Sequence, residues 1–169
     1  EELDIPKEAR VFLYAGVLNT RKNVVWLIEN FAKYHNENEY LIVLGKGDKE
    51  TECKEKADSH VRMMGFQSDP VAYMKISDVY TSASRSEGFS ISVLESLSCG
   101  LGLFLSNIPS HGEVVAMGQE IYLGETFTQE NFVQKFEKLR EKAFVKKDIE
   151  HFQKGELSAE IMTKQYETI

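Results

Sequence analysis

The stretch Ser84-Arg-Ser-Glu-Gly-Phe-Ser-Ile-Ser-Val-Leu-Glu95 joins a short apolar run that ends near Thr81 to a helical segment that begins near Ser90. The run before it is typical of a buried strand, and the segment after the polar loop has helical spacing. A strand that passes through a short loop into a helix is the repeating unit of folds with parallel sheets. The stretch therefore predicts one strand–loop–helix unit.

The rest of the chain repeats this unit. Short β-branched and aromatic runs predict strands at Arg10–Ala15, Tyr40–Leu44, Val61–Met64, Val79–Thr81, Gly102–Leu105 and Ile121–Tyr122. Helical spacing lies between them, at Val24–Tyr34, Lys49–Ala57, Pro70–Ile76, Ser90–Ser98 and Ser110–Met117, and again from about Thr128. This order predicts an α/β fold: a Rossmann-like, doubly wound, parallel six-stranded sheet in the order 3-2-1-4-5-6, with helices on both faces.

Composition excludes several classes of function. The chain has 169 residues, which is one domain's worth, and its net charge of −7 argues against a nucleic-acid partner. No apolar run approaches the roughly 18 residues of a transmembrane segment, and no signal peptide is recognisable. Cys53 and Cys99 have no CxxC partner, which suits a reducing cytoplasm. The four histidines lack metal-ligand spacing, so we expect no metal site.

Glycines follow four of the predicted strands. Parallel sheets bind ligands outside the carboxyl ends of their strands. The loops at this edge contain Gly16, Gly45 with Gly47, Gly65 and Gly88. Glycine lets backbone amides approach a ligand, although a glycine can also simply end a strand. Four such loops on one edge favour a binding site.

Two carboxylates flank the helix that begins near Ser90. Its first turn exposes unpaired amides at the positive end of the helix dipole, which is a suitable seat for a phosphate. Glu87 precedes the helix and Glu95 lies within it. Ionised carboxylates accept hydrogen bonds from sugar hydroxyls. The alternative is that Glu87 favours the helix start electrostatically and that Glu95 is an ordinary exposed helix residue.

A second candidate group follows the first strand. In Ala15-Gly-Val-Leu-Asn-Thr-Arg-Lys-Asn23, the cations Arg21 and Lys22 suit a diphosphate, or else are two solvated charges. Leu44-Gly-Lys-Gly-Asp48 lacks the third glycine of a dinucleotide fingerprint, which disfavours a nicotinamide cofactor. No Walker lysine–serine pair occurs, which disfavours an NTPase.

These motifs, in this order, resemble the retaining glycosyltransferases of family 4. The matching stretches are Tyr14-Ala-Gly-Val-Leu, Arg21-Lys-Asn, Leu41-Ile-Val-Leu-Gly-Lys-Gly, Val61-Arg-Met-Met-Gly, Ser77-Asp-Val-Tyr, Glu87-Gly-Phe-Ser-Ile-Ser-Val-Leu-Glu-Ser-Leu-Ser-Cys-Gly100 and Pro109-Ser-His-Gly-Glu113. The resemblance implies one lobe of a two-lobed GT-B enzyme. Residues 1–169 would form the donor-binding domain, with a crossover helix at about 157–169 and an N-terminal acceptor domain absent from the chain.

The resemblance also implies roles for individual residues. Lys22 and Glu87 would be the catalytic residues, on the diphosphate and on the sugar hydroxyls respectively, and Glu95 would hold the ribose. The remaining donor contacts would come from Gly16, Arg21, Gly45, Gly65, Gly88, Phe89, Ser90 and Ile91. The donor would be a UDP-, GDP- or ADP-sugar, with no metal and no other cofactor.

The expected reaction is hexosyl transfer to a saccharide or lipid-linked acceptor in surface polysaccharide or glycoconjugate biosynthesis. We expect the isolated domain to be inactive and the protein cytoplasmic, with peripheral attachment to the inner membrane face, through the absent domain, left open. Val17 stands where the family commonly has arginine, and Gly102 where it usually has proline. A degenerate binding module or a GT-B sugar-nucleotide epimerase are the alternatives.

Overall fold

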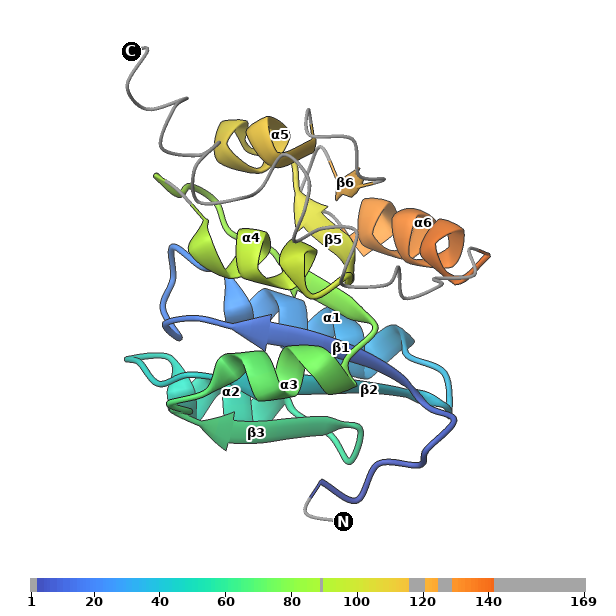
Figure 1. Cartoon of the computed structure of the whole chain (residues 1–169). Helices are drawn as coiled ribbons and strands as arrows, with labels where there is room; N and C mark the ends of the chain where they lie inside the picture. Colours follow the sequence, from blue (N-terminus) through green and yellow to red (C-terminus); the bar gives the residue numbers. More distant parts are fainter. Residues whose placement is uncertain (1–2, 89, 116–120, 125–128, 142–169) are drawn as a thin grey trace.

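The computed structural model describes residues 3–88, 90–115, 121–124 and 129–141 of the chain. Strands and helices alternate throughout this part (Figure 1). The strands are β1 (Arg10–Ala15), β2 (Glu39–Leu44), β3 (Val61–Gly65), β4 (Val79–Ser82), β5 (Gly102–Ser106) and β6 (Ile121–Gly124). The helices are α1 (Val24–Tyr34), α2 (Glu50–Lys56), α3 (Pro70–Ile76), α4 (Ile91–Ser98), α5 (Pro109–Val115) and α6 (Gln129–Arg140).

The strands of the described part form one six-stranded sheet in the order β3-β2-β1-β4-β5-β6. Every pairing is parallel. This confirms the predicted fold class and strand order. The order reverses between β1 and β4, and crevices at such a reversal are where open α/β sheets bind their ligands.

Helices cover both faces of the sheet (Figure 1). Phe12 and Tyr14 of β1 belong to the core cluster shared with α1, α2 and α6. The intervening Val11 and Leu13 belong to the cluster shared with α3 and α4. Because both faces are covered, β1 is apolar at consecutive positions instead of alternating, as expected for a central parallel strand.

The predicted boundaries of β1, α1 and α3 are confirmed, and those of the other elements differ by at most two residues. The strand predicted to begin at Tyr40 begins instead at Glu39, a charged residue that is only 4% exposed. Arg140 of α6 forms an ion pair with it at 2.6 Å, so the charge is buried with a partner that lies far away in the sequence. The expected crossover helix at about 157–169 lies outside the described residues.

Candidate functional site

The loops after β1, β2 and β3 are joined by backbone hydrogen bonds. The Gly16 N–H donates to the Leu44 carbonyl at 3.0 Å, and the Gly45 N–H donates to the Gly65 carbonyl at 2.7 Å. A Cβ atom at Gly45 would lie 1.9 Å from the Gly16 oxygen, at a φ of +129°. Close backbone packing therefore requires this glycine, and the amides of Gly16 and Gly45 are occupied within the edge itself.

Gly47 is as tightly packed, because a Cβ there would lie 2.2 Å from the Leu18 oxygen, whereas Gly65 and Gly88 lie at more open positions of the same edge. Gly65 has a φ of +67°, and a Cβ added at Gly88 would meet no heavy atom within 4 Å. Three of the four exposed large apolar side chains among the described residues also lie in this region, namely Val17, Phe66 and Ile91. Most of the exposed large apolar side chains of the described residues are therefore found near the carboxyl edge.

Helix α4 begins at this edge. Its N-cap residue is Ser90, which is 5% exposed and whose side chain makes no capping hydrogen bond. The amides of the first turn thus lack a side-chain acceptor, and they form the partially positive end of the helix. Phe89, predicted to contribute an amide here, lies outside the described residues.

Lys22 and Glu87 meet beside the start of α4. The Lys22 Nζ atom lies 2.8 Å from Glu87 Oε2, and the two side chains are 18% and 4% exposed. Burial opposes ionisation of Glu87, but the nearby polar groups of His111, Lys22 and Ser84 outweigh it and hold the pKa of the carboxyl far below its usual range. Glu87 is therefore a buried carboxylate that stays ionised.

Arg21 does not stand free as a diphosphate ligand in this structure. Its guanidinium donates to the Ser86 carbonyl at 2.9 Å, and its own carbonyl accepts from the Arg85 N–H at 2.9 Å. Arg85 also donates to Asn23 Oδ1 at 3.4 Å. These bonds fasten the loop after β1 to the loop after β4, which carries Glu87. The diphosphate role of Arg21 stays a prediction, and its observed contacts are with backbone.

His111 is a site residue that sequence reasoning missed. It is fully buried in α5, and its Nε2 atom lies 3.7 Å from Glu87 Oε1. Its Nδ1 atom lies 2.8 Å from the Ser106 carbonyl, and the Ser106 hydroxyl donates to the Ser84 carbonyl at 2.6 Å. The only available signal was its place in Pro109–Glu113, a stretch that resembles the family, because the spacing of the histidines pointed to no site.

Glu95 and Glu87 are both close enough to Tyr80 to influence its hydroxyl electrostatically. This tyrosine is buried, and its hydroxyl donates to the Ala15 carbonyl at 3.1 Å. Burial, followed by the charge of Glu87, raises the pKa of Tyr80, and the charge of Glu95 adds to this effect. Both carboxylates therefore act on the same hydroxyl. Glu95 is partly exposed, and its side chain makes no hydrogen bond or ion pair with the residues that the structure describes.

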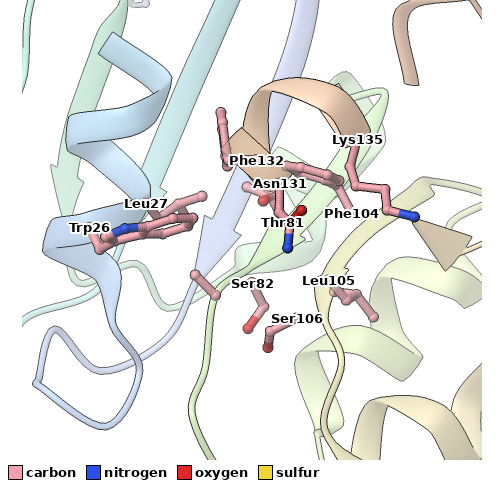
Figure 2. Close-up of a pocket in the computed structure, with 11 residues that line it drawn as sticks. Trp26, Leu27, Thr81, Ser82, Phe104, Leu105, Ser106, Asn131, Phe132 and Lys135 are labelled. Carbon is pink, nitrogen blue, oxygen red and sulfur yellow. The ribbon is translucent and has the colours of Figure 1, made fainter. Parts of the chain in front are cut away.

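Two hollows lie away from the Lys22–Glu87 pair. A small cavity of about 30 Å³ is lined by Trp26, Phe104 and Phe132 (Figure 2), and the Thr81 hydroxyl at its wall has no hydrogen-bond partner in the described part of the chain. It has room for about one water molecule and none for a sugar nucleotide. A larger hollow of about 1260 Å³ lies between α3 and the segment that precedes β1. Neither hollow is lined by Arg21, Lys22 or Glu87.

The described ranges contain neither a metal-binding cluster nor a membrane-spanning helix. No group of three or more histidine, cysteine, aspartate or glutamate side chains there could hold a metal ion. Within the same ranges, no helix combines the length and apolar character that crossing a bilayer requires.

Comparisons with known proteins agree with the fold and the motifs. The O-antigen biosynthesis glycosyltransferase WclY of Escherichia coli is 32% identical over 114 residues, which are 64% of this chain and 32% of that protein. A glycosyltransferase structure from Rickettsia africae has a TM-score of 0.79 at 20% identity, over 99% of this chain and 48% of that one. Anabaena HepE, solved in complex with UDP and glucose, has a TM-score of 0.76 at 18% identity, over 95% and 48%.

The chain thus spans a third of the curated relative and about half of each solved structure. Its six-stranded sheet corresponds to one lobe of the GT-B fold. The family model for glycosyl transferases group 1 matches residues 1–154. This chain belongs to the glycosyl transferases group 1 family.

Proposed function

We infer that this chain is the donor-binding half of a retaining glycosyltransferase and that it holds a nucleoside-diphosphate sugar at the carboxyl edge of its sheet. The observation that carries this proposal is the pairing of Lys22 with the buried, ionised Glu87 beside the uncapped start of α4. A cation, a helix N-terminus and a strong hydrogen-bond acceptor are the groups that a diphosphate and a sugar require.

Each group has a distinct task in the proposed reaction. Lys22 and the first-turn amides of α4 stabilise the negative charge that develops on the leaving diphosphate. Glu87 accepts hydrogen bonds from the sugar hydroxyls and so orients the sugar. Glu95, four residues into α4, accepts from the ribose. No step calls for a metal ion, since the leaving charge is met by the cation and the helix.

The acceptor enters through a part of the protein beyond this chain. HepE was solved with UDP and glucose, and the E. coli relative is named for O-antigen biosynthesis. A relative from Campylobacter jejuni is named as a transferase acting on a diphospho-undecaprenol acceptor. These names support transfer of a hexosyl group to a saccharide or lipid-linked acceptor, and a chain limited to these residues should bind donor without transferring sugar.

A non-catalytic binding module is the second candidate, and Val17 favours it. This residue is 52% exposed and apolar at the position where the family commonly has arginine. Arg21, the nearest replacement in the sequence, is engaged with the Ser86 carbonyl. Such a lobe would bind a partner protein and no nucleotide.

Calorimetric titration with UDP, GDP and ADP, and with the glucose conjugate of each, separates the two candidates. The donor-binding proposal predicts saturable binding of one nucleoside diphosphate. It also predicts a clear rise in melting temperature, since a ligand at a hundred times its Kd stabilises the folded state by about 2.7 kcal/mol. Neither heat nor stabilisation with any of the six ligands would refute it and favour the module.

A further inference from the structure

His111 has one nitrogen whose role is fixed by its surroundings. The Nδ1 atom lies 2.8 Å from the Ser106 carbonyl, which can only accept, so Nδ1 must carry the hydrogen. In the neutral ring Nε2 then presents a lone pair, and it carries a hydrogen only in the protonated ring. The ring is fully buried, so its two nitrogens depend on protein groups for hydrogen bonds.

The other nitrogen, Nε2, faces the carboxylate of Glu87. Nε2 is buried and has no hydrogen-bond partner among the described residues. It lies 3.7 Å from Glu87 Oε1, which is too far for an ordinary hydrogen bond and close enough for an ionic contact. The opposite oxygen of the same carboxylate is the one that Lys22 holds. The carboxylate thus lies between Lys22 Nζ, which contacts it, and His111 Nε2, which is not yet within hydrogen-bond distance.

Lys22 and His111 would respond differently to a bound donor. On the proposed function, the diphosphate recruits Lys22, and the carboxylate of Glu87, 4% exposed, would lose its only short ionic contact in the described part of the chain. A buried charge without a partner is strongly unfavourable. A shift of less than 1 Å would bring Nε2 into hydrogen-bond range of Oε1.

We propose that His111 is a positioning residue that takes over Glu87 when the donor diphosphate draws Lys22 away. The protonated ring donates from Nδ1 to Ser106 and from Nε2 to Glu87, so the carboxylate stays ionised and oriented toward the sugar. The Ser106 hydroxyl fixes the Ser84 carbonyl of the same loop at 2.6 Å, which holds the carboxylate in reach of the ring. This inference rests on the proposed donor-binding function.

A double-mutant cycle tests it in this chain, with UDP-, GDP- and ADP-glucose as probes. His111→Gln places an amide nitrogen near the position of Nε2, whereas His111→Asn reaches only as far as Nδ1. With Glu87 present, His111→Asn should lower the affinity for the bound sugar nucleotide by about ten- to a hundredfold, and His111→Gln should retain most of it. In a Glu87→Gln background the His111→Asn change should cost less than about twofold.

Two results would overturn the proposed role of His111. An equal loss from His111→Asn in both backgrounds would overturn the inference, since the residue would then act on the fold and not through the charge of Glu87. An equal loss from both His111 variants would overturn it as well. Melting curves of all variants show whether each is folded. Absence of binding by the wild-type chain would refute the proposed function itself, which is a different result.

Discussion

Replacing Glu87 by glutamine should change the affinities for a bare nucleoside diphosphate and for its sugar conjugate in opposite directions. The carboxylate holds Lys22 at 2.8 Å beside the start of α4. A diphosphate that recruits Lys22 therefore competes with Glu87 for the same ammonium group. Glutamine keeps the size and one acceptor oxygen but removes the charge, so it releases Lys22 without creating a cavity.

The expected change in binding free energy follows from the loss of the Lys22–Glu87 ion pair. A hydrogen bond between charged groups contributes about 1.5–3 kcal/mol, and a neutral acceptor keeps roughly half of that. The gain for the bare diphosphate should be about 1 kcal/mol, or about fivefold in Kd. The sugar conjugate loses the charged acceptor for its hydroxyls, at a cost of about 1–3 kcal/mol. The ratio of the two affinities should therefore fall by at least about tenfold.

Isothermal titration of the wild type, Glu87→Gln and Lys22→Ala with both ligands measures these changes. Lys22→Ala is the matched control, because it removes the cation and should weaken both ligands by about ten- to a hundredfold while sparing the free nucleoside. The reasoning fails if Glu87→Gln leaves the bare diphosphate unchanged or weakens it while Lys22→Ala still lowers its affinity. That result would show that Glu87 and the diphosphate do not compete for Lys22.

Three further changes test other parts of the structure. Glu95→Gln should weaken every nucleoside diphosphate, with or without sugar, by about 1–3 kcal/mol in the same titration, and a loss confined to the sugar conjugates would contradict a ribose contact. Gly45→Ala should lower the free energy of unfolding in urea by more than about 3 kcal/mol, because its Cβ would lie 1.9 Å from a backbone oxygen, while Gly88→Ala, in open space, should change it by less than about 0.5 kcal/mol. The pKa of Glu39 is lowered because the hydrogen bonds and charge of Arg140 overcome the effect of burial. The stabilisation from this pair is therefore complete above the ordinary pKa of 4.5 and is lost as the pH falls through the lower pKa of the folded state. Arg140→Leu should lower the free energy of unfolding by about 2 kcal/mol at pH 7, and denaturation curves should show a weaker dependence of stability on acid pH.

The sequence by itself determined the strands and their order, and it predicted the edge on which the candidate site lies. Apolar runs such as Arg10–Ala15 are continuous because a central parallel strand is buried on both faces, and this property is local enough to read from the chain. The right-handed crossover rule then limits how such units can be arranged. The same local patterns placed Glu87 and Lys22 at the ends of strands, where a ligand would bind.

Only the tertiary structure decided which side chains meet. Lys22 and Glu87 lie on different loops, and their contact at 2.8 Å depends on β1 and β4 being neighbours in the sheet. The burial of Glu39 against Arg140 and the approach of His111 to Glu87 likewise join residues whose own segments carry no sign of the partner. A periodic pattern reports the average environment of a face, whereas an ion pair depends on two specific atoms brought together by distant parts of the chain, and no local pattern encodes that distance.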